Sequence, residues 1–108
     1  MRYHKLVRDK IPEIISRSGT TAIVHGANSE EYREKLREKL QEEVAEFLAS
    51  GDPEELADIL EVLFALAEHG GVSRESLEQI RARKAEERGA FRERIILEET
   101  HEQEKQCP

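Results

Sequence analysis

The sequence predicts a mainly α-helical bundle, formed by a single domain of residues 1–97 and followed by a polar tail, residues 98–108. A chain of 108 residues has the length of one domain. Charged residues make up 38% of the chain and aromatic residues only 5%, with no Trp, so the core must be largely aliphatic. Two long segments on either side of Gly51-Asp52-Pro53 repeat apolar residues every three or four positions, and their Leu, Ala, Glu and Lys residues favour helix.

The first predicted helix begins near Asp9 and ends before Gly19. Asp9 is a suitable N-cap, and Pro12 falls in the first turn, where its missing N–H costs nothing. Gly19 suits the position that follows a last helical turn. Residues 20–25 and 91–97 are both rich in β-branched or apolar residues, so we expect them to pair as a small two-stranded β element.

The second predicted helix covers residues 29–50 and is capped by the serine at its start. Its apolar stripe consists of Leu36, Leu40, Val44, Phe47 and Leu48. At about 100° per residue, Glu43 falls at the margin of this stripe and Glu46 lies beside it but further out. Glu42 falls nearly opposite the stripe and is expected to face water, whereas Lys39 shares the lateral position of Glu43 and Glu46.

The third predicted helix follows Gly51-Asp52-Pro53 and ends at Gly70-Gly71. It is apolar on most sides, and a chain this short cannot cover it alone. We therefore expect a second subunit to complete the core, in a homodimer or a dimer of dimers. Asp58 and Glu61 stand out in this apolar helix, because a buried carboxylate is normally neutralised, paired or bound to a metal.

Four carboxylates form the most informative pattern. Glu43 and Glu46 lie three residues apart on the second helix, and Glu55 and Asp58 lie three apart on the third, so each pair shares one helix face. Antiparallel packing would bring all four together. Oxygen-only clusters suit Mg²⁺, with Mn²⁺ as an alternative. Two other interpretations stay open: solvated ion-pair faces, and a capping box between Glu55 and Asp52.

Cations gather near both ends of the chain. The last predicted helix is capped by Ser73, ends at Gly89 and is basic in its second half. These positions either decorate helix ends, which is the ordinary use of surface charge, or hold phosphate groups. The cations in question are Lys5, Arg8 and Lys10 near the start, and Lys84 and Arg88 near the end.

Composition limits the classes of function. The net charge of −7 argues against a general nucleic-acid binder. Cys107 is alone, so no intrachain disulfide or Cys-based zinc site is expected, and the four histidines form no ligand pattern. The start, MRYHKLVRDK, lacks the apolar stretch of a signal peptide and no apolar run has membrane-spanning length. We expect a cytoplasmic protein with no membrane partner.

Three segments in this order resemble a known family. They are KLVRDKIPEII, KLQEEVAE…EELADILEVLFAL and KAEERGAFRERIIL, and together they span most of residues 3–97. The chain thus resembles the MazG-like all-α nucleotide pyrophosphohydrolases, in their short single-domain form. The resemblance implies Mg²⁺-dependent hydrolysis of a nucleoside triphosphate between the α and β phosphates, in a house-cleaning role. The spacer between the two acidic pairs is shorter than in many members, which leaves the substrate open.

The resemblance also implies residue roles. Glu43, Glu46, Glu55 and Asp58 match the metal ligands, and Glu61 matches a carboxylate that orients water. The basic positions that could hold phosphates are Lys5, Arg8, Lys10, Lys39, Lys84 and Arg88. Two alternatives remain: a phosphoribosyl-ATP pyrophosphohydrolase of histidine synthesis, and a non-catalytic helical dimer whose acidic face keeps it soluble.

Overall fold

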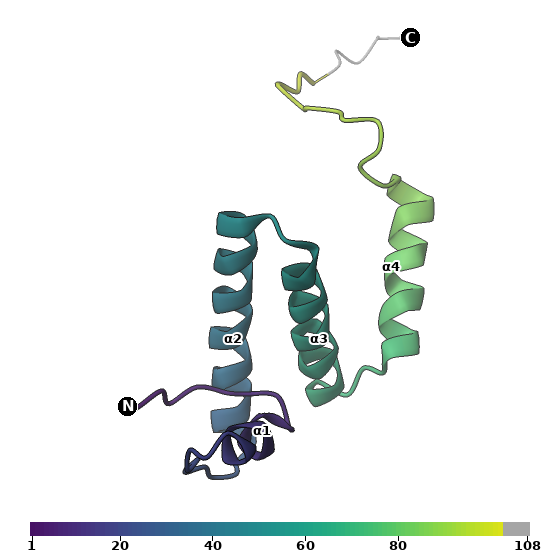
Figure 1. Cartoon of the computed structure of the whole chain (residues 1–108). Coiled ribbons are helices and arrows are strands. Elements are labelled where there is room, and N and C mark those ends of the chain that lie inside the picture. The colour runs from purple at the N-terminus through teal and green to yellow at the C-terminus, as the bar shows by residue number, and fades with distance from the viewer. Residues whose placement is uncertain (103–108) are drawn as a thin grey trace, which may run out of the picture.

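A computed structural model of the chain describes residues 1–102 and contains four helices in this part (Figure 1). In chain order they are α1 (Ile11–Arg17), α2 (Ser29–Ser50), α3 (Pro53–His69) and α4 (Arg74–Arg88). The prediction of a mainly helical fold is confirmed. No helix among the described residues is long and apolar enough to cross a membrane.

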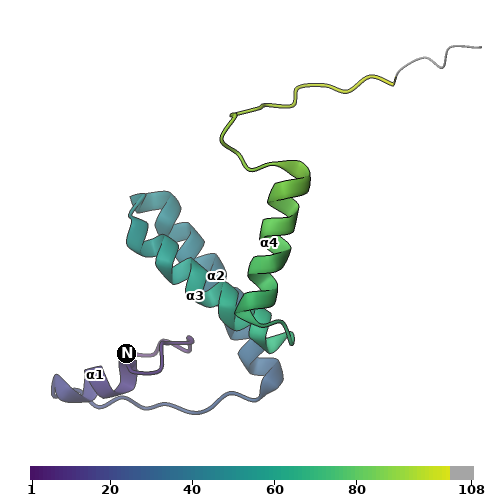
Figure 2. The same cartoon turned by 90° about the vertical axis from the view of Figure 1, so that its right-hand side faces the viewer.

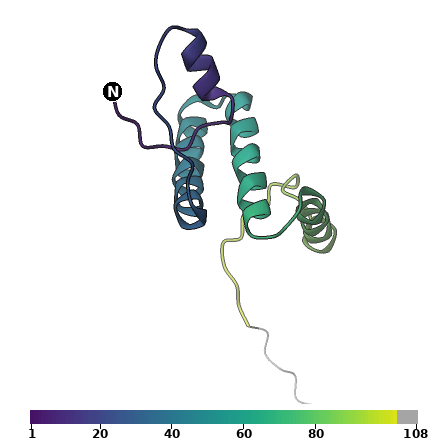
Figure 3. The same cartoon turned by 90° about the horizontal axis from the view of Figure 1, so that it is seen from below.

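The α2–α3 hairpin is the centre of the fold. The two helices lie antiparallel and side by side, and theirs is the most extensive contact between helices (Figures 1 and 2). α4 contacts only α3, and its second half diverges from the hairpin. Seen from below, α1 and α4 lie on opposite flanks of the hairpin (Figure 3). The four predicted metal ligands therefore lie on two neighbouring helices, Glu43 and Glu46 on α2 and Glu55 and Asp58 on α3.

The turn between α2 and α3 follows the sequence closely. Gly51 adopts a left-handed conformation with φ of 68°, which suits glycine, and its N–H donates to the Phe47 carbonyl. The Asp52 side chain caps α3 by accepting from the Glu54 N–H at 3.0 Å. The Asp52 N–H donates to the Ser50 hydroxyl, so the capping box with Glu55 is not formed. The Glu55 carboxylate is therefore left for another use.

Other helix boundaries agree with the prediction to within a residue or two. Asn28, and not Ser29, caps α2, accepting from the Glu31 N–H at 2.9 Å. An amide oxygen caps as well as a hydroxyl, so the neighbouring residue takes the position. The N-cap of α1 is Lys10, one residue after the predicted Asp9, and its side chain makes no capping bond. Ser73 caps α4 as expected.

The expected β element is not shown. Residues 20–25 and 91–97 form no strand within the described part of the chain, 1–102. They lie at opposite ends of a molecule that extends 79 × 32 × 22 Å (Figures 1 and 2). A strand needs a ladder partner for its backbone groups, and neither segment has the other within reach. Of the predicted tail, residues 103–108, including Cys107, lie outside the described residues.

The core within one chain is small. Leu36 and Val62 are its buried apolar residues among those described, whereas Leu48, predicted to lie in the α2 stripe, is 77% exposed. The radius of gyration is 20.5 Å, against about 13 Å for a compact domain of 100 residues. Three residues of α3 form an exposed leucine stripe, at spacings of four and three: Leu56, Leu60 and Leu63.

Candidate metal centre

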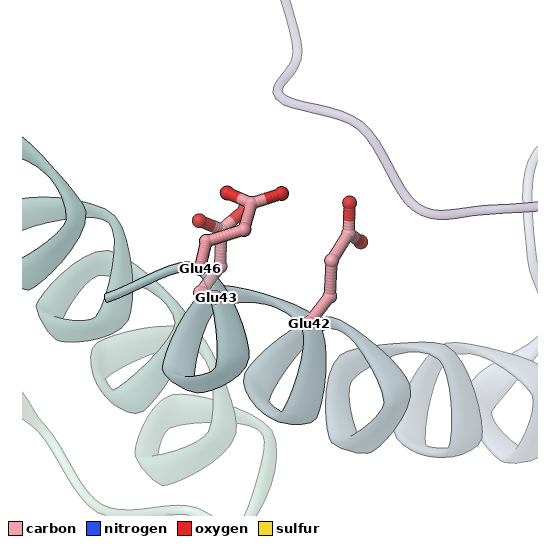
Figure 4. A group of neighbouring side chains, drawn as sticks. All are labelled: Glu42, Glu43 and Glu46. Carbon is pink, nitrogen blue, oxygen red and sulfur yellow. The ribbon is translucent and has the colours of Figure 1, made fainter. Parts of the chain in front are cut away.

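Carboxylates from α2 and α3 converge beside the turn that joins these helices. Oxygens of Glu43, Glu55 and Asp58 lie within 4.8 Å of one another, and so do oxygens of Glu42, Glu43 and Glu46. Figure 4 shows the α2 members of this set on one side of that helix. Glu43 belongs to both groups and joins them. We call these five residues the carboxylate cluster.

Glu43 lies at the centre of the cluster and is only 6% exposed. Its Oε1 faces the Lys39 ammonium at 3.2 Å, but its Oε2 is buried without a hydrogen-bond partner. Oε2 of Glu55 is likewise buried and unpartnered. Leaving a buried acceptor unpaired costs about 1–3 kcal/mol and more for a charged group. Two such oxygens on facing helices therefore indicate a site that accepts a proton or a cation.

The protonation of Glu55 reflects this crowding. Burial, together with a hydrogen bond and charge repulsion from Glu46 and Glu43, raises the pKa of Glu55 to about 7. Because all these groups are acceptors when ionised, the hydrogen bonds exist only when one of them carries a proton. Near neutral pH, Glu55 is thus poised between a shared proton and full ionisation.

Lys39 is the cation built into the centre. Its side chain is 18% exposed and lies 3.5 Å from Glu42 as well as 3.2 Å from Glu43. Burial lowers its pKa, but the hydrogen bond to Glu43 and the charges of both glutamates outweigh burial and raise it. Lys39 therefore stays protonated and neutralises part of the cluster. In this position its ammonium group contacts two carboxylates and is not available to bind a phosphate.

Glu42 does not face water as predicted. It is half-buried, and its carboxylate meets Lys5 at 3.6 Å as well as Lys39. The N-terminal segment (residues 1–10) passes over this side of α2, as the pale purple ribbon in Figure 4 shows. Helical periodicity orders residues within one helix and carries no information about a segment 37 positions away. The i, i+3 spacing of Lys39 and Glu42 was the only signal available in the sequence.

Arg8 brings a further cation to the cluster. Its Nη2 lies 2.5 Å from Oδ1 of Asp58, across 50 positions of sequence. With every group ionised, the five carboxylates meet three cations, which are Lys5, Arg8 and Lys39. Two negative charges remain in excess, which is the charge that one divalent cation neutralises.

The remaining predicted site residues are not brought to the cluster. Glu61 pairs with Arg74 at the start of α4, at 3.4 Å, on another side of α3. Lys84 and Arg88 lie on the diverging half of α4 and form no ion pair with the described residues. Lys10 caps α1 with its backbone and likewise has no ion pair among them. In one chain, three of the six predicted phosphate-binding cations thus lie next to the carboxylates, namely Lys5, Arg8 and Lys39.

The donor set fits Mg²⁺ or Mn²⁺. All donors are carboxylate oxygens, which hard cations prefer. Adjacent oxygens of an octahedral Mg²⁺ are about 3 Å apart and opposite ones about 4.2 Å, so oxygens separated by up to 4.8 Å would have to move closer together to bind one ion. Glu43, Glu55 and Asp58 would hold the ion between the helices, and Glu46, which is exposed, would complete the set toward solvent.

A comparison of the chain with protein-family models, curated proteins and solved structures found no match.

Proposed function

We propose that this chain is a Mg²⁺-dependent nucleotide pyrophosphohydrolase. It would cleave a nucleoside triphosphate or related nucleotide between the α and β phosphates, giving a monophosphate and pyrophosphate. The observation that carries the proposal is the pair of buried, unpartnered oxygens on Glu43 and Glu55, in reach of Asp58. The reaction class comes from the resemblance of three sequence segments to MazG-like enzymes.

The carboxylates would have distinct roles. Glu43, Glu55 and Asp58 bind the cation, which when present offsets the charge of the triphosphate and polarises a phosphoryl oxygen. Glu46 is exposed at the edge of the cluster, where it can orient a water molecule and accept its proton. The water oxygen forms the new bond to phosphorus as the bridging P–O bond breaks. No side-chain nucleophile is required.

The cations would serve the phosphates. Lys5 and Arg8 already lie at the cluster, where a phosphate chain on the cation would come within reach of both. Lys84 and Arg88 can contribute only if α4 of a second copy, or a different position of α4, presents them. Glu61, held by Arg74, has no part in the proton transfer as the single chain is arranged.

A second copy of the chain is part of the proposal. The leucine stripe on α3 is 50%, 48% and 39% exposed at Leu56, Leu60 and Leu63, which is unfavourable for apolar side chains aligned on one helix. Packing against another copy would cover it and complete the core. The same stripe favours the rival function, a non-catalytic helical interaction module, since such a module needs the stripe and not the carboxylates.

Product analysis separates these functions. The purified chain is incubated with Mg²⁺ and a panel of ordinary and modified nucleoside triphosphates, with phosphoribosyl-ATP included, and pyrophosphate is resolved from orthophosphate. Glu43→Gln removes the central ligand, and Glu34→Gln is the matched control, about two and a half turns earlier on α2 and exposed.

Pyrophosphate released by the wild type and by Glu34→Gln, but reduced at least about 100-fold in Glu43→Gln, is the expected result, since losing a metal ligand removes charge stabilisation from the transition state. Turnover of phosphoribosyl-ATP alone would identify the histidine-synthesis alternative. No product from any nucleotide, or equal rates in all three proteins, would refute the proposed reaction.

A further inference from the structure

Two ion pairs join the N-terminal segment to the hairpin. α1, which follows it, packs against none of the other three helices. Residues 1–10 form two ion pairs with the hairpin, Lys5–Glu42 at 3.6 Å and Arg8–Asp58 at 2.5 Å. The side chains of Leu6 and Val7, between these cations, are half-buried. Residues 1–10 therefore cross over α2 and α3 with their two ion pairs on the carboxylates beneath them (Figures 1 and 4).

Both carboxylates that hold the segment are members of the carboxylate cluster. Asp58 lies in the group with Glu43 and Glu55, and Glu42 lies in the group with Glu43 and Glu46. A cation on either group would come within about 2.1 Å of its ligand oxygens. It would then stand close to the Arg8 guanidinium or the Lys5 ammonium, and like charges at that distance repel.

The two ion pairs are weak competitors. The side chains of Arg8 and Lys5 are 55% and 44% exposed, and ion pairs exposed to this degree contribute little to stability. A divalent ion bound by several carboxylates gains charge and coordination that one ammonium or guanidinium group does not. The buried oxygens of Glu43 and Glu55, which no side chain of the segment reaches, favour the ion further.

We infer that a divalent cation and the N-terminal segment compete for the same carboxylates, so that cation binding detaches Lys5 and Arg8 and loosens residues 1–10. This inference rests on the proposed cation site and adds a regulatory step to it. The detached cations stay covalently linked to α2 through α1 and residues 18–28, so an anionic substrate at the site can still capture them. Cation binding would thus free Lys5 and Arg8 to contact the phosphates of the substrate.

Limited trypsin digestion tests this inference, with peptides identified by mass spectrometry. Cleavage after Lys5 requires its side chain to leave Glu42 and enter the protease. Digestion is run with and without MgCl₂ at matched ionic strength, because salt alone screens exposed ion pairs. Cleavage after Arg92 and Arg94, in the exposed segment beyond α4, is the internal control for effects of Mg²⁺ on trypsin itself.

Arg8→Ala is compared with Arg37→Ala, an exposed arginine of α2 that forms no ion pair with the described residues. We expect Mg²⁺ to raise the Lys5 cleavage rate about threefold or more in the wild type and in Arg37→Ala. Arg8→Ala should be cleaved fast without Mg²⁺ and should bind Mg²⁺ about twofold to fivefold more tightly, because one competing pair is gone.

Calorimetric Mg²⁺ titration of the same samples separates the two ways to fail. If Mg²⁺ binds but leaves Lys5 cleavage unchanged or slows it, the competition is refuted and the proposed cation site stands. If Mg²⁺ does not bind to the wild type, the proposed cation site fails and the inference fails with it.

Discussion

The two sides of α3 reverse the usual distribution of polar and apolar side chains. The side facing α2 carries Val62 but also Glu55 and Asp58, which converge on the buried Glu43. The outer side carries the exposed leucine stripe. Carboxylates are rarely buried and aligned leucines are rarely exposed unless a ligand or a partner accounts for them. The proposed cation site rests on the inner side of this contrast, and the proposed contact with a second copy rests on the outer side.

Truncating a buried side chain of α2 should have the largest effect on stability, and it tests whether the packing of α2 against α3 stabilises the hairpin. Leu36 is 2% exposed, so Leu36→Ala should destabilise the chain by about 2–5 kcal/mol through lost burial and a cavity. Leu48→Ala, at a residue 77% exposed on the same helix, should change stability by no more than ~0.5 kcal/mol. Urea unfolding followed by circular dichroism measures both. Equal effects would mean that the hairpin packing is wrong.

A charge placed in the leucine stripe tests the outer side. Leu60→Glu should convert the proposed assembly to single chains, because burying one leucine contributes about 1.5–3 kcal/mol and burying a glutamate costs more than that gain. Light scattering gives the mass, with Glu54→Gln on the same helix as the control. A mass that is unchanged by Leu60→Glu, or that is already that of one chain in the wild type, would contradict the assigned interface.

A substitution in the α2–α3 turn should have a smaller effect on stability. This turn fixes where α3 begins and therefore how both sides of α3 are oriented. The Asp52 side chain accepts from the Glu54 N–H, so Asp52→Ala should cost about 1 kcal/mol. Asp52→Asn keeps an accepting oxygen and should cost a few tenths at most. Thermal unfolding of the two variants measures the difference. If they lose equal stability, the cap does not hold the start of α3.

The pH dependence of stability is the smallest expected effect, since Glu55 is only half-buried. Its pKa is raised from 4.5 to about 7 in the folded chain. The folded state therefore binds more protons than the unfolded state between these values, so stability should fall as pH rises through this window. Glu55→Gln should flatten this part of the melting-temperature curve, measured with chelator and no added divalent ion. An unchanged slope in Glu55→Gln would show that the carboxyl group is not the one titrating.

The helices and their caps could be predicted because they depend on neighbouring residues. Gly51 and Asp52 alone specify the end of one helix and the start of the next, and the structure agrees. The convergence of Glu43 with Glu55 and Asp58 follows from two helix periods and one short turn. These relations are local, and a single sequence contains them.

The features that could not be predicted depend on contacts distant in sequence. The α2 pattern predicts that Glu42 faces water, because nothing in it indicates that Lys5 lies against this carboxylate. Residues 20–25 and 91–97 have strand-like composition, but a strand also needs a partner in space, which composition does not specify. Helix periodicity likewise does not indicate that Glu61 pairs with Arg74, because Arg74 belongs to the next helix.

Calorimetric titration of Mg²⁺ into the wild type, Glu43→Gln and Glu34→Gln tests the central claim most directly, because it needs no knowledge of the substrate. The account predicts saturable binding to the wild type and to Glu34→Gln, with affinity at least about tenfold weaker in Glu43→Gln, a loss of ~1.4 kcal/mol. Glu43→Gln without Mg²⁺ should be as stable as the wild type or more so, because one of the facing charges is gone. Equal Mg²⁺ affinity in all three proteins, or none in any, would contradict the assignment of the carboxylate cluster as a metal centre.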